Sequence, residues 1–187
     1  MSDRDQERWD RRWSDAGPLY SPNTLLVDST SLLKGGVALD LACGRGQNAI
    51  WLVQHGYHVL AVDISPVALS AARAQALALQ VAQQVTFAAV DLDHWTPPED
   101  AFDLIVVFRF LDRRLFLPIR RALRSGGLIF YSTRHLGALK RYPQANESYL
   151  LKTGELRSAF PDWQILHYEE GSVDAELIAK KPEVIEQ

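Results

Sequence analysis

The sequence predicts an α/β fold in which a doubly wound, mostly parallel sheet carries helices on both faces. Two observations support this prediction. Apolar runs typical of strands buried on both sides alternate along the 187 residues with segments of helical pattern. A small-residue turn at residues 42–46 also follows the first apolar run and precedes an apolar helical segment, which is the order of a nucleotide-binding βαβ unit. We expect a single domain.

The N-terminal segment, residues 1–35, is predicted to be helical and to lie outside the sheet. Trp9 and Trp13 are four residues apart in a charged helix expected over residues 3–14, so both indoles share one face. That face either packs on the main body or forms a lid over a ligand. Glycine and prolines predict a loop at residues 17–22, which leads into a short helix over residues 24–33.

Residues 36–187 supply the sheet and its helices. Strands are expected at residues 37–41, 58–62, 85–90, 102–108, 128–132, 164–168 and 175–180, and helices at 46–55, 66–79, 111–123 and 154–160. Ser65 and Pro66 predict the start of the second of these helices, because serine caps a helix and proline suits its first position. A turn is expected at 125–127, and residues 93–100 leave little room for a helix. The long irregular segment 133–152 is a candidate functional region.

Composition narrows the classes of function. The net charge of −3 gives no positive surface of the kind that binds nucleic acid or an anionic membrane, and no apolar run is long enough to cross a bilayer. The single cysteine, Cys43, cannot form an internal disulfide, and the charged N-terminus does not resemble a secretory signal. We expect a cytoplasmic protein, either a monomer or a homodimer, with a small-molecule partner.

Three aspartates fall at or near the carboxyl ends of the first three expected strands, where doubly wound sheets bind ligands. Residues 44–49 satisfy the dinucleotide pattern G-x-G-x-x-A, and Asp63 follows at about the expected 20-residue distance. However, the negative charges of the three aspartates would repel a pyrophosphate. S-adenosylmethionine carries a sulfonium and an ammonium and no phosphate, so the charges favour it. Asp40 would attract its cationic methionyl portion, and Asp63 would accept the ribose hydroxyls. Asp91 would bind the adenine amino group, with Leu92 near the ring.

Residues 39–46, Leu-Asp-Leu-Ala-Cys-Gly-Arg-Gly, resemble motif I of class I S-adenosylmethionine-dependent methyltransferases, with Ala42 where the first glycine is usual. Residues 63–66 resemble the end of the second strand of that family, and residues 125–127 resemble the turn before its fifth strand. Three stretches, 44–49, 109–113 and 146–156, are similar to small bacterial methyltransferases of the tellurite-resistance type. The resemblance implies a Rossmann-like sheet of seven strands with the last one antiparallel. It also implies S-adenosylmethionine as methyl donor and S-adenosylhomocysteine as product.

The resemblance and the charge pattern together give the expected site. The expected cofactor-binding residues are Asp40, Ala42, Cys43, Gly44, Gly46, Asn48, Asp63, Ile64, Ser65, Asp91, Leu92 and Phe108. The candidate catalytic residues are Arg109, after the fourth expected strand, and Arg134 and His135, after the fifth. Two arginines would hold a carboxylate or an oxyanion, and His135 would be a base near neutral pH. The alternatives are that the arginines pair with Glu147 or Glu155 or are solvated, and that His135 takes no part.

Methyl transfer from an activated sulfonium requires mainly proximity and alignment, so we expect no catalytic triad. A thiol, a chalcogen oxyanion or a small carboxylate is the expected acceptor. Cys43 is expected to pack against the ligand, and the five histidines show no zinc-binding spacing. The arginine-rich segment 113–124 is interpreted as a solvated outer face.

Two other functions stay open from the sequence. An NAD(P)-dependent oxidoreductase would use a similar sheet, although the chain has no Tyr-x-x-x-Lys pair of the short-chain type. A catalytically silent protein that binds S-adenosylmethionine is also possible, since the acceptor side has no diagnostic residue.

Overall fold

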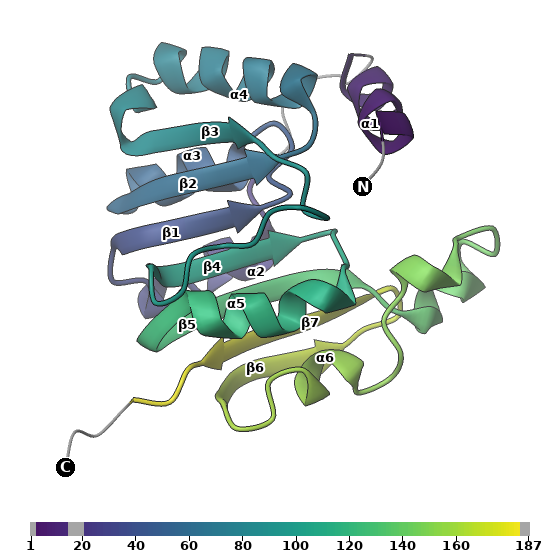
Figure 1. The fold of residues 1–187 in the computed structure, drawn as a ribbon. Coiled ribbons are helices and arrows are strands. Elements are labelled where there is room, and N and C mark those ends of the chain that lie inside the picture. The colour runs from purple at the N-terminus through teal and green to yellow at the C-terminus, as the bar shows by residue number, and fades with distance from the viewer. Residues whose placement is uncertain (1–2, 15–20, 184–187) are drawn as a thin grey trace. The chain divides into compact units, whose positions relative to one another are not determined.

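The computed structural model describes residues 3–14 and 21–183 (Figure 1). Its strands form a seven-stranded sheet of order β3-β2-β1-β4-β5-β7-β6, in which β7 runs antiparallel to its neighbours. This confirms the predicted fold class, including the antiparallel last strand. Contacts divide the chain into two compact units, Met1–Thr96 and Pro97–Gln187, and each is described by itself.

In the first unit, the described residues form three parallel strands and four α-helices. The strands are β1 (Gly36–Leu41), β2 (Tyr57–Asp63) and β3 (Val85–Ala89), and the helices are α1 (Asp3–Ser14), α2 (Thr24–Asp28), α3 (Gln47–Gln54) and α4 (Pro66–Ala78). β2 pairs with both other strands, in parallel. α3 packs on β1 and β2, and α4 packs on β2 and β3. Because helices cover them, β1 and β2 bury most of their residues, as their apolar runs predict.

Helix α4 begins where the sequence predicts. Ser65 is its N-cap, with an extended backbone, and its Oγ accepts a hydrogen bond from the Ala68 N–H at 3.1 Å. Pro66 then occupies the first turn, where a backbone N–H would have no partner within the helix, so the absence of this N–H in proline costs no hydrogen bond. This cap fixes the direction in which the chain leaves β2.

Up to residue 183, where the described part of the chain ends, the second unit contains four strands and two short α-helices. The strands are β4 (Phe102–Phe108), β5 (Leu123–Arg134), β6 (Gln164–Glu170) and β7 (Asp174–Lys180), and the helices are α5 (Phe116–Ala122) and α6 (Glu155–Ser158). β4 and β5 are parallel, while β7 is antiparallel to both β5 and β6. The core of this unit includes the fully buried side chains of Ile105, Ile119, Phe130, Tyr131 and Phe160.

Several predicted boundaries differ from the structure. The expected turn at 125–127 lies inside β5, because the β4–β5 register jumps from the Phe102–Leu123 pair to the Leu104–Leu128 pair and the extra residues bulge out. The expected helix at 111–123 is a 3₁₀ turn at 113–115 followed by α5. The expected helix at 24–33 is likewise α2 followed by a 3₁₀ turn at 30–32.

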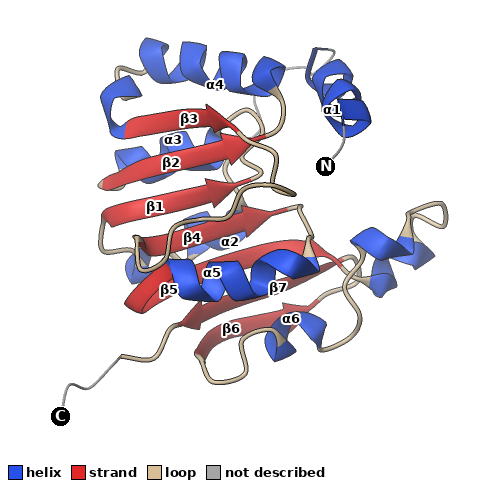
Figure 2. Cartoon of the chain, in the orientation of Figure 1, coloured by secondary structure: helices blue, strands red, loops and turns tan. Residues whose placement is uncertain are grey.

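Other segments agree with the prediction or fall outside the described residues. Only turns and loop link β3 to β4, drawn in tan in Figure 2, so there is no helix in that connection. The irregular segment 133–152 contains the end of β5 and 3₁₀ turns at 136–140 and 147–149. Most of the predicted loop at 17–22 falls outside the described residues. Within the described part of the chain, no helix is long and apolar enough to cross a membrane.

Candidate functional site

The glycine turn after β1 has a left-handed backbone at three of its five residues. Ala42 has φ 55°, Gly44 has φ 54° and Gly46 has φ 75°. The turn is held at its start by a hydrogen bond from the Cys43 N–H to the Val62 carbonyl at 2.9 Å. Gly46 ends the turn and is the N-cap residue of α3. The chain thus reverses at the carboxyl end of β1 within a few residues.

Substitutions of Ala42 and Gly46 are expected to change the free energy of unfolding in opposite directions. Ala42→Gly should raise the free energy of unfolding by about 0.5–1 kcal/mol, because alanine is strained at positive φ. Gly46→Ala should lower it by about 1–3 kcal/mol, since a Cβ there would lie 2.8 Å from the Phe87 ring and 2.9 Å from the Ala72 Cβ. Urea denaturation of the two variants measures both changes. A loss of stability in Ala42→Gly would contradict the strain argument.

Asp63 holds the glycine turn to the end of β2. Its side chain is 8% exposed. Its Oδ2 accepts a hydrogen bond from the Gly44 N–H at 2.8 Å, and its Oδ1 accepts one from the Ser65 N–H at 2.9 Å. Burial raises the pKa of Asp63, and these backbone bonds act in the opposite direction. A backbone hydrogen bond from Ile64 also lowers the pKa of Asp63, and because a carboxylate has about four lone-pair sites, Asp63 can still accept a hydrogen bond from a ligand.

Asp40 lies beneath the same turn and is 1% exposed. Burial, followed by the negative charge of Asp63, raises the pKa of Asp40 to about 8, while a bond from the Ala49 N–H lowers it. Its Oδ2 is buried and has no hydrogen-bond partner among the described residues. A buried, unpartnered acidic oxygen is costly, so this arrangement favours a nearby cation or donor.

Two further predicted cofactor residues have protein partners already. The Asn48 Oδ1 accepts a hydrogen bond from the Asn23 N–H at 2.9 Å and so anchors the residue that caps α2. Cys43 is 3% exposed, and burial, followed by the charge of Asp40, raises the pKa of its thiol. The thiol therefore stays protonated, which agrees with packing rather than a nucleophilic role.

The remaining predicted donor residues of the first unit lie at the ends of β2 and β3. Ile64 and Ser65 are buried beside Asp63. Leu92 is 4% exposed, and the neighbouring Asp91 is more accessible. Asp91 accepts a hydrogen bond from the Asp93 N–H at 2.9 Å, and this bond lowers the pKa of Asp91. Asp91 is thus ionised at neutral pH.

The structure also reveals a contact that the sequence does not predict. A Cβ on Gly44 would lie 2.9 Å from Cζ2 of the Trp13 indole, so the residue that approaches this glycine closely is a tryptophan of α1. The Ser65 hydroxyl donates a hydrogen bond to the Asp10 carboxylate. Asp10 and Trp13 are three residues apart in a helix and therefore share a face, which is the signal available in the sequence.

In the second unit, Phe108 is the last residue of β4 and Arg109 follows it. Phe108 is buried, whereas Arg109 is exposed and has φ 57°. The Arg109 N–H donates to the Ser132 carbonyl at 2.8 Å, which holds the strained residue in place. Its guanidinium has no ion pair with any described residue. Strained backbone that the surrounding structure enforces is common at functional sites.

Arg134 is the last residue of β5, His135 follows it, and the two side chains make different contacts. The Arg134 guanidinium lies 4.5 Å from the centre of the Tyr142 ring, where Arg141 also lies at 5.6 Å. The His135 Nε2 bonds to the Gly171 carbonyl at 2.8 Å, and its Nδ1 accepts from the Gly137 N–H at 3.3 Å. Both ring nitrogens thus bind backbone, which favours a structural role for His135 over that of a base.

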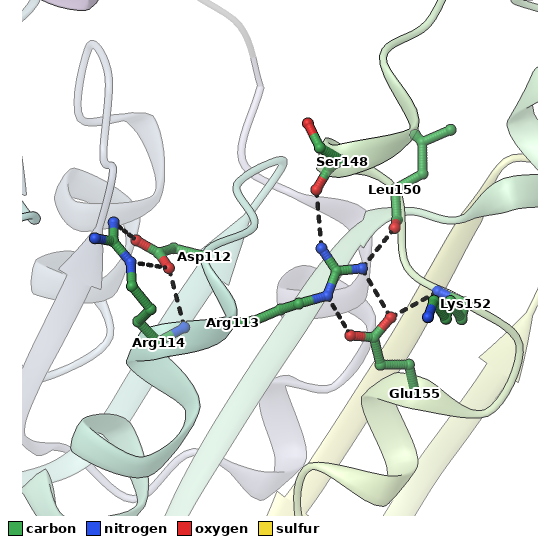
Figure 3. Close-up of polar contacts among 7 residues, drawn as sticks. All are labelled: Asp112, Arg113, Arg114, Ser148, Leu150, Lys152 and Glu155. Atoms are coloured by element: carbon green, nitrogen blue, oxygen red, sulfur yellow. Dashed lines mark hydrogen bonds and ion pairs between the residues drawn. The ribbon is translucent and has the colours of Figure 1, made fainter. Parts of the chain in front are cut away.

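Arg113 is an exception to the predicted solvated arginine face (Figure 3). Its guanidinium binds both carboxylate oxygens of Glu155, at 2.5 and 2.9 Å, and the carbonyls of Ser148 and Leu150, each at 2.8 Å. These bonds lower the pKa of Glu155. The pairing predicted as an alternative for Arg109 or Arg134 is therefore made by Arg113, and it fixes the segment after the 3₁₀ turn at 147–149.

Comparison with known proteins shows what the chain is similar to. Residues 38–127 match the family described as "Methyltransferase domain". This part of the chain is therefore similar to a methyltransferase domain. Its strand order and glycine turn agree with the match. Within the described residues, no group of three or more His, Cys, Asp and Glu side chains is arranged to hold a metal ion.

The individual relatives of this chain are distant. Hemagglutinin 1 of Eikenella corrodens is 32% identical over 169 residues, which cover 77% of this chain and 54% of that protein. A ubiquinone biosynthesis O-methyltransferase of Alkalilimnicola ehrlichii is 26% identical over 171 residues, covering 84% and 66%. The chain thus spans about half to two thirds of the length of these relatives. The solved structure of TehB from Haemophilus influenzae has a TM-score of 0.75 at 18% identity, covering 94% of this chain and 66% of TehB, and shares the fold.

Proposed function

We propose that the chain transfers a methyl group from S-adenosylmethionine to a small-molecule acceptor and releases S-adenosylhomocysteine. The buried Asp40 carboxyl group beneath the glycine turn carries this proposal. Its Oδ2 has no partner among the described residues, and the second buried carboxylate, Asp63, lies close enough to raise its pKa. A sulfonium or ammonium would favour the ionised forms of both groups, whereas the negative charge of a dinucleotide phosphate would disfavour them.

The first unit supplies the donor-binding groups in this proposal. Asp63 accepts the ribose hydroxyls with the lone pairs that its backbone bonds leave unused. Asp91 accepts from the adenine amino group, and Leu92 packs beside the ring. Asn48 and Cys43 shape the site by packing and by anchoring α2, because their polar atoms are buried or already bonded.

The activated donor supplies the leaving group, so the acceptor atom forms its bond to the methyl carbon as the carbon–sulfur bond breaks and sulfur keeps the electron pair. The protein then needs to align the two reactants and exclude water rather than provide a strong base. This agrees with His135, whose ring nitrogens both bind backbone.

For the acceptor, we propose an anion or a soft nucleophile: a thiol, a chalcogen oxyanion or a small carboxylate. Arg109, whose guanidinium is exposed and makes no ion pair with a described residue, is the main acceptor-binding residue. Arg134, stacked on Tyr142, is the second. The net charge of −3 supports a small molecule over nucleic acid. A cytoplasmic location and a monomeric or homodimeric state stay predictions from the sequence.

Calorimetry with three ligands tests the donor. S-adenosylmethionine and S-adenosylhomocysteine should bind, and NADH should not. Binding of NADH alone would instead support the oxidoreductase. Binding of S-adenosylmethionine without turnover on thiols, chalcogen oxyanions or small carboxylates would support the catalytically silent alternative.

Donor binding should release about one proton at pH 7. With a pKa of about 8, Asp40 is mostly protonated in the empty protein, and a bound cation favours its ionised form. Binding heats of S-adenosylmethionine measured in phosphate and in Tris, which differ in ionisation enthalpy, give the number of protons. S-adenosylhomocysteine, which lacks the sulfonium charge, should release fewer. Equal heats in both buffers would contradict the role of Asp40.

Asp40→Asn is the matched control for this measurement, because it keeps the shape and loses the titrating group. Proton release should disappear in this variant. The folded pKa of Asp40 lies above the ordinary value of 3.8, so the folded protein holds a proton that the unfolded chain releases. The contribution of Asp40 to stability therefore falls as pH rises from 3.8 to about 8. Asp40→Asn should weaken this dependence of the free energy of unfolding on pH, which urea denaturation at several pH values measures.

A further inference from the structure

Helix α1 carries an aromatic face with basic residues around it. The Trp9 and Trp13 rings are stacked with centroids 6.3 Å apart, and the guanidinium carbons of Arg8 and Arg12 lie 5.7 and 5.4 Å from the Trp9 ring. The helix packs against α4 within the first unit (Figure 1). Trp13 is partly exposed.

α1 makes its polar and aromatic contacts at the edge where the donor is proposed to bind. Trp13 lies against Gly44, just after β1, and Asp10 accepts a hydrogen bond from Ser65, just after β2. Asp63 bonds to both Gly44 and Ser65, so α1 lies over the two residues that this carboxylate joins. Ligands of doubly wound sheets bind outside these carboxyl ends. A ligand bound there must therefore lie against α1.

We propose that α1 closes over the donor site and that Trp13 is a donor-positioning residue, held in place by the bond between Ser65 and Asp10. This inference rests on the proposed function. In it, the indole forms one wall of the site, and the helix lifts to admit the donor and release the product. An indole face also attracts a cationic ligand.

The charges near α1 provide a reason for closure to depend on the donor. Asp10 is a third carboxylate beside Asp63, and its negative charge contributes to the raised pKa of Asp63. In the empty protein, docking of α1 therefore brings like charges together, which opposes the Ser65 bond. A bound cation offsets this repulsion. The donor should thus hold α1 closed more firmly than the empty site does.

Variants of Trp13 test its role in positioning. Trp13→Ala should raise the dissociation constant of S-adenosylmethionine by about 10-fold or more, and Trp13→Phe should recover most of the affinity because it keeps an aromatic face. The donor KM should rise in parallel, with the acceptor KM unchanged, which a general loss of structure would not produce. Trp51→Phe is the matched control, since Trp51 stacks on His55 in α3, and it should bind the donor normally.

Limited trypsin digestion of the unchanged protein tests closure without a substitution. Arg8, Arg11 and Arg12 are exposed cleavage sites on α1. S-adenosylhomocysteine should slow cleavage at these residues several-fold. Unchanged or faster cleavage would overturn the inference, as would a Trp13→Ala variant that binds the donor as tightly as the wild type or more tightly. If the wild type does not bind the donor, both the proposed function and this inference fail. If it binds the donor without the expected effects on Trp13→Ala or on cleavage, only this inference fails.

Discussion

Replacing Asp63 by alanine should raise the dissociation constant for S-adenosylmethionine about 100-fold and lower the free energy of unfolding by about 2–4 kcal/mol. The stability loss follows because the side chain is buried and accepts from two backbone N–H groups, those of Gly44 and Ser65. Both N–H groups would lose their partner. The affinity loss follows because the ribose loses its acceptor and the glycine turn loses its link to β2.

Calorimetry and urea denaturation of the Asp63→Ala variant measure the two effects. Asp103→Ala is a matched control, since Asp103 is a more exposed aspartate whose ion pair with Arg124 spans 2.9 Å. Its stability change should stay within about 1 kcal/mol, as for other surface ion pairs, and donor binding should not change. A stable Asp63→Ala variant with unchanged donor affinity would show that the donor site lies elsewhere.

Replacing Arg109 by glycine should change stability and activity in opposite directions. Glycine adopts φ 57° without strain, so the free energy of unfolding should rise by about 0.5–1 kcal/mol. The same change removes the guanidinium that we propose binds the acceptor. For an anionic acceptor, kcat/KM should fall about 30- to 100-fold, which corresponds to losing charge-assisted hydrogen bonds of about 2–3 kcal/mol.

Gln80 offers a matched control for the backbone effect. It also has positive φ, 58°, and is exposed where the chain leaves α4. Gln80→Gly should gain similar stability and leave methyl transfer unchanged. Arg109→Lys should keep the strain and part of the acceptor affinity, because lysine retains the charge but not the forked geometry. Full activity in Arg109→Gly would exclude Arg109 from acceptor binding.

The local signals in this sequence are strong where one element decides its own conformation. The apolar run at 102–108 matches β4 at both ends, and Ser65-Pro66 fixes the start of α4. Predictions fail where a distant segment decides. The expected turn at 125–127 is absorbed into β5, because pairing with β4 continues on both sides of the bulge.

For the site, the sequence by itself determines the glycine turn and the carboxylates at the strand ends, because parallel strands place consecutive carboxyl ends at one edge of a sheet. Only the tertiary structure decides which partners these residues have. In the structure, the Asn48 amide oxygen accepts a hydrogen bond from the Asn23 N–H, and Trp13 lies against Gly44. Glu155 binds Arg113. These contacts join residues that lie more than 20 positions apart in the sequence. The packing of whole helices and strands brings such residues into contact, and local patterns of charge and hydrophobicity do not predict which distant residues meet.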